Sequence, residues 1–211
     1  MLISIYQLKP RFQALLRPQA ELLARIGITA NQVTIAGMLV SVAIGGVLLH
    51  WNERRELFLL LPAWMFLRMA LNALDGMLAR DFGQKSLLGA YLNELSDVVS
   101  DAVLYLPFVA VAPFGWASIG SIIFLSGLSE MAGAMGPMIG ADRRYDGPMG
   151  KSDRAFVFGA LGLWVAVASA LPGWVFWLMP AMAGAIAVNV VNRVRGGIQQ
   201  ASMQTLRKES V

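Results

Sequence analysis

The sequence predicts an all-α integral membrane protein with six transmembrane helices and an N-terminal amphipathic helix at the membrane interface. Apolar residues make up 57% of the 211 residues and the mean hydropathy is +0.60, both higher than in a soluble domain of this size. Six segments are long enough to cross a hydrocarbon core of about 30 Å, and they lack the alternation of barrel strands. We expect a single domain (1–211), with residues 1–27 as an interfacial segment, 32–194 as a helix bundle and 195–211 as a cytoplasmic tail.

The first element is an amphipathic helix within residues 1–27. Apolar residues such as Phe12, Leu16 and Leu23 recur there at helical spacing opposite basic residues. Pro10 and Pro18 interrupt any continuous apolar core, which argues against a cleavable signal peptide. The pattern predicts a helix that lies on the membrane surface.

Six transmembrane helices are expected to follow, at about 32–50, 57–79, 87–112, 115–137, 155–171 and 174–194. The second and third contain charged residues, and a turn of a few residues around Asp81 to Ser86 makes them antiparallel neighbours. The spacing of Gly136 and Gly140 permits close contact between helices.

Basic residues are concentrated on one side of the predicted membrane. Fourteen of the 17 Lys and Arg residues fall in segments on that side, namely Lys9, Arg11, Arg17, Arg25, Arg80, Lys85, Arg143, Arg144, Lys151, Arg154, Arg193, Arg195, Arg207 and Lys208. Only Arg54 and Arg55 fall on the other side. The positive-inside rule therefore predicts that both termini lie in the cytoplasm, in a bacterial inner membrane. The pI near 9.8 reflects this topology and attraction to anionic lipids, so no nucleic-acid partner is expected.

The second and third helices carry polar residues at near-helical spacing, from Asn72 to Asp101. Asp75 follows Asn72 by three positions, and Asn93, Asp97 and Asp101 recur every four. Each carboxylate within lipid costs roughly 2.5–3.5 kcal/mol on insertion scales, so these residues are functional candidates. Because the two helices are antiparallel neighbours, their oxygen atoms can meet between them.

Oxygen ligands of this kind suit hard cations such as Mg²⁺ or Mn²⁺. A carboxylate cluster in a low dielectric needs compensating positive charge to stay ionised. The chain has no cysteine, which excludes thiolate ligands and thiolate catalysis. Gly76 and Gly89 leave room for a ligand, and Arg80 can bind phosphate oxygens.

At these residues the chain resembles the CDP-alcohol phosphotransferase family, integral membrane enzymes that make phospholipid headgroups. The signature of that family is D-x2-D-G-x2-A-R-x8-G-x3-D-x3-D. Six positions match it, namely Asp75, Gly76, Ala79, Arg80, Gly89 and Asp97. Residues 29–34 (TANQVT) are similar to the T-P-N-x-I-T stretch of many members, and the overall pattern looks most like a bacterial branch.

The resemblance implies transfer of a phosphatidyl group from CDP-diacylglycerol, or a similar CDP-lipid, to a small alcohol or alcohol phosphate such as glycerol 3-phosphate, with release of CMP. It implies that Asp97 is the general base and that Mg²⁺ or Mn²⁺ binds at the aspartate positions. It also implies that Gly76, Ala79, Arg80 and Gly89 border the nucleotide, with Asn31 and Thr34 nearby. Members of the family are generally homodimers.

Two departures from the signature concern the metal. Asn72 and Asn93 stand where the family has aspartates, and an amide oxygen brings no negative charge. Asp101 or Glu94 can restore that charge, or the site can hold one ion tightly and bind a second with the diphosphate. The sequence therefore predicts one or two divalent ions with Asp75, Asp97, Asn72 and Asn93 as ligands.

Further charged residues lie outside the signature. Arg143, Arg144, Lys151 and Arg154 form a basic cluster in the fourth connection, which is expected to bind either an acceptor phosphate or lipid headgroups. Arg68 is expected to pair with Asp75 or Asp101, or to contact substrate. Glu130 is expected to face the cavity or a dimer seam.

Two other functions remain open. The first is a catalytically silent homologue that binds a CDP-lipid. The second is a cation or proton transporter that uses the buried carboxylates, although the sequence shows neither inverted repeats nor discontinuous helices.

Overall fold

Helices form all the regular structure of the computed structural model, which describes residues 5–168 and 170–209. Within these residues there are seven α-helices, four 3₁₀-helices and no β-strand. The α-helices are α1 (Ile5–Arg25), α2 (Ala30–His50), α3 (Leu60–Asp81), α4 (Leu87–Tyr105), α5 (Trp116–Ala134), α6 (Lys151–Val167) and α7 (Leu178–Glu209). The 3₁₀-helices are η1 (Arg55–Leu59), η2 (Leu106–Ala110), η3 (Gly136–Ile139) and η4 (Gly173–Trp177).

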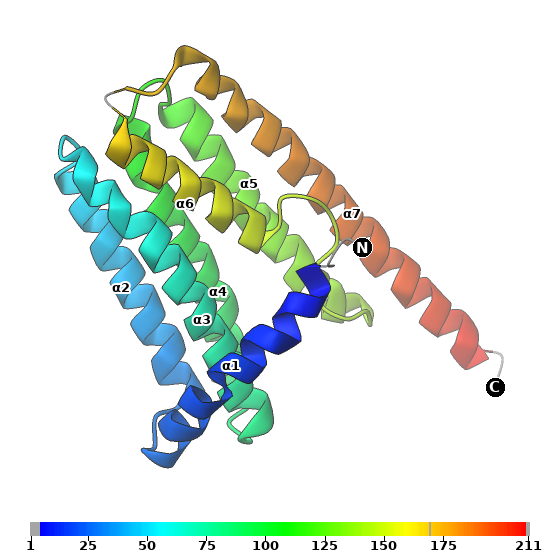
Figure 1. Cartoon of the computed structure of the whole chain (residues 1–211). Helices are drawn as coiled ribbons and strands as arrows, with labels where there is room; N and C mark the ends of the chain where they lie inside the picture. The colour runs from blue at the N-terminus through cyan, green and yellow to red at the C-terminus, as the bar shows by residue number, and fades with distance from the viewer. Residues whose placement is uncertain (1–4, 169, 210–211) are drawn as a thin grey trace.

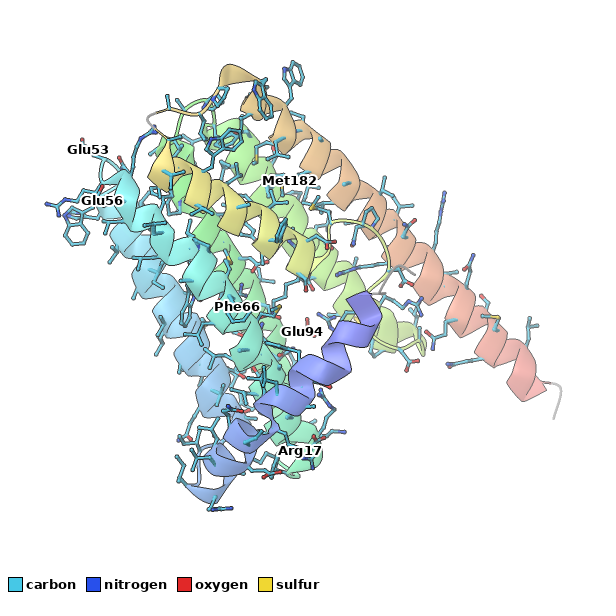
Figure 2. The ribbon with its side chains drawn as sticks, viewed as in Figure 1. Arg17, Glu53, Glu56, Phe66, Glu94 and Met182 are labelled. Atoms are coloured by element: carbon cyan, nitrogen blue, oxygen red, sulfur yellow. The ribbon has the colours of Figure 1, made fainter. Side chains whose placement is uncertain are left out.

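Six of the helices form a bundle, and α1 lies across it (Figure 1). Within the bundle, α2 packs against α3 and α4, α4 packs against α5, and α5 packs against α7. Helix α6 packs against α3, and α1 crosses α3. The connection of α2 to α3, with Glu53 and Glu56, lies at one end of the molecule, whereas Arg17 and Glu94 lie toward the other (Figure 2).

Four stretches of the described chain are long and apolar enough to cross a membrane, namely Ala30–His50, Arg55–Asp81, Trp116–Ile139 and Gly173–Leu206. Helix α4 carries three carboxylates, and α6 has only 17 residues. The prediction of an all-helical protein with membrane-spanning helices is therefore confirmed. The crossing of α4 and α6 stays a prediction, although both helices are present.

Helix α1 occupies the segment where an amphipathic helix was expected. Its Ala20 is fully buried against Leu74 and Met77 of α3, whereas Leu15 and Leu22 are exposed on the other side. An exposed apolar face of this kind suits a helix at a lipid surface, a location that stays a prediction. Residues 1–4 of the predicted segment and residues 210–211 of the predicted tail lie outside the described residues.

Several elements differ from the sequence expectations. The helix expected at 87–112 ends at Tyr105 and is followed by η2. Helix α7 does not end at residue 194 but continues to Glu209. Contacts with the α5–α6 connection hold this extension, since Arg144 donates to Gln200 at 2.7 Å. The expected glycine contact is also wrong, because Gly136 and Gly140 flank η3 and not one face of a helix. Pro137, which lacks a backbone N–H, prevents α5 from continuing through them.

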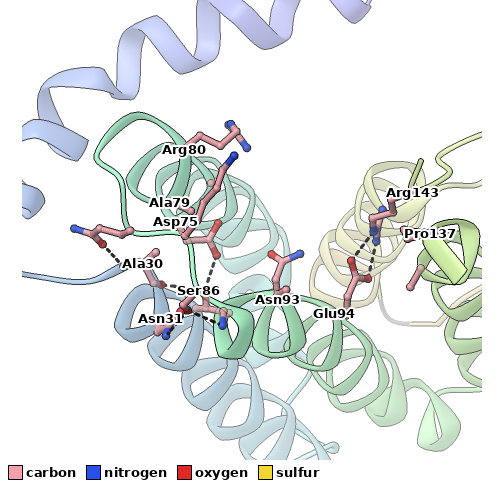
Figure 3. A pocket seen from close by; sticks show the side chains of 17 residues that line it. Ala30, Asn31, Asp75, Ala79, Arg80, Ser86, Asn93, Glu94, Pro137 and Arg143 are labelled. Atoms are coloured by element: carbon pink, nitrogen blue, oxygen red, sulfur yellow. Dashed lines mark hydrogen bonds and ion pairs between the residues drawn. The ribbon is translucent and has the colours of Figure 1, made fainter. Parts of the chain in front are cut away.

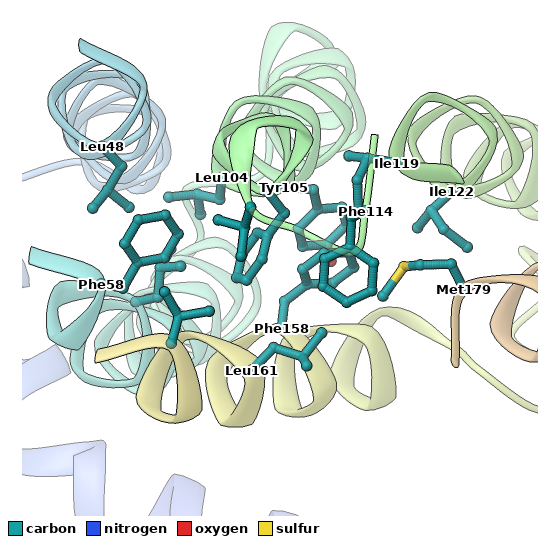
Figure 4. Close-up of a cluster of buried hydrophobic side chains, with 14 of the residues drawn as sticks. Leu48, Phe58, Leu104, Tyr105, Phe114, Ile119, Ile122, Phe158, Leu161 and Met179 are labelled. Atoms are coloured by element: carbon teal, nitrogen blue, oxygen red, sulfur yellow. The ribbon is translucent and has the colours of Figure 1, made fainter. Parts of the chain in front are cut away.

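The main apolar cluster includes Phe58, Leu104, Tyr105, Phe114 and Phe158 (Figure 4), and two smaller clusters lie around Leu74, Met77 and Leu78 of α3. In the main cluster, Tyr105 and Phe158 stack at 3.8 Å between ring centroids, and Phe58 and Phe108 pack edge to face at 5.4 Å. All four rings are fully buried. This packing joins η1, which leads into α3, to α4, η2 and α6 at one end, so that the opposite ends of α3, α4 and α6 are free to carry polar groups.

Capping residues set where α2 and α4 begin. Thr29 and Gln32 form a capping box, in which the Gln32 amide oxygen accepts from the Thr29 N–H at 2.9 Å. Ser86 caps α4 by accepting from the Gly89 N–H at 2.9 Å. The Ala30 N–H donates to the side chain of Gln84 at 2.7 Å, which ties the start of α2 to the α3–α4 connection. These bonds bring the first turns of α2 and α4 to the last turn of α3.

Candidate active site

The ends of α2, α3 and α4 enclose a cavity of about 520 Å³ (Figure 3). Its lining includes eight of the predicted site residues, namely Asn31, Thr34, Asp75, Gly76, Ala79, Arg80, Gly89 and Asn93, together with Arg143. It also includes Gln84, Lys85, Ser86 and Glu94, which were not assigned to nucleotide binding from the sequence. Ser86 carries a recognisable signal, since a serine before an apolar run is a typical helix N-cap, whereas Gln84 acts through a contact with Ala30, which is distant in sequence.

Asp75 is the buried carboxylate of this cavity. Its residue is 5% exposed, and its Oδ2 atom accepts a hydrogen bond from the Thr34 hydroxyl at 2.8 Å. Thr34 lies one turn after the capping box of α2, so the start of that helix positions the hydroxyl. The second oxygen of Asp75 has no protein hydrogen-bond donor among the described side chains.

The two signature glycines stand where side chains would collide. A Cβ atom on Gly89 would lie 2.7 Å from the Asn31 amide oxygen and 2.9 Å from the Ser86 hydroxyl. A Cβ atom on Gly76 would lie 3.0 Å from Nη1 of Arg80. Glycine at these positions therefore lets Asn31 and Arg80 reach the cavity.

Asp97 and Asp101 belong to a buried network of ion pairs next to the cavity. Arg68 donates to Asp101 Oδ1 at 2.6 Å and to Asp97 Oδ1 at 3.3 Å. Arg154 donates to Asp101 Oδ2 at 3.2 Å, and the Lys151 ammonium contacts Asp97 Oδ1. The expected pairing of Arg68 with Asp101 is confirmed, whereas Arg68 forms no ion pair with Asp75.

A second cavity of about 590 Å³ lies between α3 and α6. Most of its lining is apolar, including Met65, Phe66 and Phe156. Asn72, Arg68 and Lys151 form its polar part. The predicted metal ligands are thus divided, since Asn72 lines this cavity while Asp75 and Asn93 line the first.

The donor atoms suit one divalent cation better than two. Within residues 5–168 and 170–209, no group of three or more His, Cys, Asp or Glu side chains is placed to hold a metal ion. Both carboxylate oxygens of Asp101 form ion pairs with arginines, and one oxygen of Asp97 contacts Arg68 and Lys151. Two carboxylates with partly offset charge do not balance two divalent ions.

Each residue of the predicted phosphate-binding cluster is paired with a carboxylate. Arg144 binds Asp146 with two hydrogen bonds of 2.7 Å, and this contact holds the pKa of Asp146 below its usual value. Lys151 contacts Asp97, and Arg154 contacts Asp101 and Glu130.

Arg143 binds Glu94, with 2.8 Å from Nη2 to Oε2. Burial alone would lower the pKa of Arg143, but the hydrogen bond and the attraction to Glu94 outweigh burial and raise it. Arg143 also contacts Glu130 at 3.1 Å, so it joins the α4 surface to a buried carboxylate of α5.

Glu130 lines neither cavity but lies buried among three arginines, Arg143, Arg154 and Arg193, and its place at a dimer seam stays a prediction. The sequence marked Glu130 as a functional candidate because it is a carboxylate in an apolar helix. Its arginine partners could not be predicted, because they come from three other segments of the chain.

Comparison with known proteins agrees with the signature. The sequence profile of the CDP-alcohol phosphatidyltransferase family matches residues 27–191. The chain belongs to the CDP-alcohol phosphatidyltransferase family. The profile spans α2 to α6 and much of α7, so the family assignment covers the whole bundle.

Two curated proteins are similar in sequence to this chain. It is 46% identical over 175 residues to the inner membrane protein YnbA of Escherichia coli (strain K12). The aligned segment covers 83% of the chain and 85% of YnbA. It is 31% identical over 117 residues to a phosphatidylinositol phosphate synthase of Mycobacteroides abscessus. This aligned segment covers 53% of the chain and 49% of the synthase.

A solved structure shares the fold of this phosphatidyltransferase chain. It is the phosphatidylinositol phosphate synthase of Mycobacterium tuberculosis, crystallised with CDP-DAG bound. The TM-score is 0.67 at 21% identity, over 87% of the chain and 92% of the synthase. Together with the membrane-spanning stretches, these matches establish an integral membrane protein of the phosphatidyltransferase fold.

Proposed function

We propose that the chain transfers a phosphatidyl group from CDP-diacylglycerol or a similar CDP-lipid to a small alcohol or alcohol phosphate, such as glycerol 3-phosphate, and releases CMP. The observation that carries this proposal is the gathering of the signature residues of α3 and α4 around one cavity beside a second, apolar one. Family membership and the CDP-DAG-bound fold neighbour support the same donor.

The first cavity suits the nucleotide and its diphosphate. Arg80 and Lys85 line it and bring positive charge for phosphate oxygens. Asn31 and Thr34 lie on the α2 side, and Gly76, Ala79 and Gly89 leave space for close approach. The groove between α3 and α6, with its methionine and phenylalanine side chains, suits the acyl chains of the donor.

A divalent ion, Mg²⁺ or Mn²⁺, is part of the proposal. Asp75, Asp97 and the amide oxygen of Asn93 are the residues that would hold it, and Asn72, which lines the second cavity, would have to reach the ion from there. When bound, such an ion neutralises charge on the diphosphate and on the departing CMP. The asparagines are consistent with a bacterial branch of the family whose site holds one ion tightly.

Asp97 is the proposed general base. The acceptor oxygen forms a bond to the phosphorus that carries the lipid, the bond from that phosphorus to the oxygen of CMP breaks, and the hydroxyl proton passes to Asp97. Arg68 holds Asp97 through both its side-chain and backbone oxygens, at 3.3 and 3.2 Å. Asp101, bonded to Arg68 and Arg154, is proposed as a positioning residue that orients Arg68.

The membrane arrangement that fits this activity has all six bundle helices crossing a bacterial inner membrane. Both termini and the first cavity then face the cytoplasm, where a soluble acceptor is accessible and CMP is released, and α1 lies on the cytoplasmic surface. The charge asymmetry of the connections supports this orientation. A homodimer is the proposed assembly.

A catalytically silent CDP-lipid-binding protein is the second candidate. The observation that favours it is the engagement of Asp97 by Arg68 and Lys151, which competes with proton transfer and metal binding. The two candidates share the donor site and differ only in turnover.

One assay separates the two candidates. Purified protein in lipid nanodiscs would receive CDP-diacylglycerol, Mn²⁺ and a panel of alcohols and alcohol phosphates, with CMP and lipid products identified by mass spectrometry. We expect CMP and a new phospholipid with at least one acceptor. Binding of CDP-diacylglycerol without CMP release from any acceptor would favour the silent protein.

A further inference from the structure

The basic residues at the two ends of the first cavity differ in their pairing. Arg80 and Lys85, at the end formed by α3 and α4, make no ion pair with another described residue. At the other end, formed by Glu94, Ala134, Pro137 and Arg143, the guanidinium of Arg143 is held by Glu94 (Figure 3). Free positive charge is thus available at the proposed nucleotide end only.

Glu130 lies behind Arg143 and contacts three arginines. Its Oε1 accepts from Arg154 at 2.9 Å, and its Oε2 lies 3.1 Å from Arg143 and 3.4 Å from Arg193. The side chains of Glu130, Arg154 and Arg193 are 6%, 0% and 3% exposed. Because water cannot replace these partners, removing one of them leaves an uncompensated buried charge.

An incoming phosphate monoester would disturb this balance. Such a group carries a charge of about −1.5 to −2 near neutral pH. The three arginines already face Glu94, Glu130 and, through Arg154, Asp101. To bind them, the phosphate would have to take Arg143 from its carboxylates and add negative charge beside the buried Glu130.

We propose that the acceptor is an uncharged alcohol or polyol. Glu130, together with Glu94 and Asp101, offsets the charge of the three arginines and so selects against phosphorylated acceptors. Hydroxyl groups donate to carboxylates and accept from guanidinium groups, so they add hydrogen bonds to Glu94 and Arg143 without separating the pair. This inference rests on the proposed transferase function and narrows its acceptor. It also distinguishes the chain from an enzyme that requires the phosphate of its acceptor.

The test compares matched pairs of acceptors on the full chain in nanodiscs with CDP-diacylglycerol and Mn²⁺. Glycerol is paired with glycerol 3-phosphate, and inositol with inositol 1-phosphate. For at least one pair we expect kcat/KM, measured as CMP release, to be at least about tenfold higher for the uncharged member. Preference for the phosphorylated member in the pairs that react overturns the inference and leaves the transferase function intact. Absence of CMP release from every acceptor contradicts the transferase function itself.

Variants test whether Glu130 causes the selection. Glu130→Gln removes one carboxylate from three arginines, and we expect the ratio of phosphorylated to uncharged acceptor use to rise at least about tenfold. Glu56→Gln, a matched change at an exposed glutamate of the opposite end, should leave the ratio unchanged. If Glu130→Gln does not fold, Glu94→Gln frees Arg143 at a half-buried position and should shift the ratio in the same direction. A folded variant with an unchanged ratio overturns the role of these carboxylates.

Discussion

At the residue scale, the Thr34 hydroxyl donates to Asp75 at 2.8 Å and fixes the orientation of a carboxylate that lines the proposed donor site. Asp101 differs from Asp75, because both of its carboxylate oxygens are bonded to arginines. Two aspartates of one motif region thus have different environments, one with an oxygen open to a ligand and one enclosed by protein. The predictions for single residues follow from this difference.

The first prediction concerns Asp75 and Thr34. Asp75→Ala should lower the rate of CMP release by more than about a hundredfold, since it removes a carboxylate proposed to hold the divalent ion at the diphosphate. Thr34→Val, which removes only the orienting hydroxyl, should lower it about tenfold, and Thr34→Ser should restore it. Thr205→Val is the control, because that hydroxyl is exposed on α7 and bonds only to the Ala201 carbonyl. A wild-type rate in Asp75→Ala would contradict the site assignment.

The second prediction concerns the two asparagines of the signature. The double variant Asn72→Asp with Asn93→Asp adds two negative charges and should raise the affinity for Mn²⁺ at least about tenfold, as measured by electron paramagnetic resonance titration. Asn52→Asp, in the connection at the opposite end, is the matched control. If the double variant binds Mn²⁺ no better than the wild type, the asparagines are not ligands.

The third prediction compares two arginines of the basic cluster. Arg154→Ala should lower the free energy of unfolding in detergent by about 3–5 kcal/mol, because Asp101 and Glu130 lose a buried partner. Arg144→Ala should cost about 1 kcal/mol or less, because its partner Asp146 is 39% exposed and stays hydrated. Similar losses in both variants would show that the Arg154 network contributes nothing beyond a surface pair.

At the scale of the elements, α4 and α6 decide the membrane topology. Helix α4 pairs its carboxylates with Arg68, Lys151 and Arg143, which offsets the cost of placing them in lipid. Helix α6 has 17 residues, and the segment around Val167 continues its apolar stretch. Both helices run beside qualifying spans, so their crossing is the simplest arrangement.

Single cysteines test this arrangement, since the chain has none. Glu53→Cys, Gly115→Cys and Gly173→Cys should react with a membrane-impermeant maleimide on intact cells. Lys85→Cys and Tyr145→Cys should react only after the membrane is opened. Labelling of Lys85→Cys and Gly115→Cys from the same side would show that α4 does not cross.

The helix positions were predictable from sequence, but several ends and most ion pairs were not. Apolar runs located α2, α3 and α5 within a few residues, because lipid-crossing segments carry a strong compositional signal. The extension of α7 depends on Arg144 and Gln200, which lie far apart in sequence. For the same reason, the signature predicted that Asp75 and Gly89 would meet, but not that Lys151 contacts Asp97 or that Glu130 binds three arginines.

At the scale of the whole molecule, the bundle separates an apolar end from a polar one. Stacked aromatic rings join α4 and α6 at the first end, and ion pairs join α3, α4 and α6 to α5 and α7 at the second. Two cavities of different polarity lie on α3, one lined by Asp75 and Arg80 and the other by Met65 and Asn72. The arrangement suits a donor with a charged nucleotide and apolar acyl chains.

The most direct measurement of the central claim is CMP release from CDP-diacylglycerol by the wild type and Asp97→Asn, with Mn²⁺ and an alcohol acceptor. Asparagine preserves the shape of the side chain but cannot take the hydroxyl proton. The account predicts acceptor-dependent CMP release by the wild type and a rate at least about a hundredfold lower in a folded Asp97→Asn variant. Equal rates in the two proteins, or no release by the wild type, would contradict it.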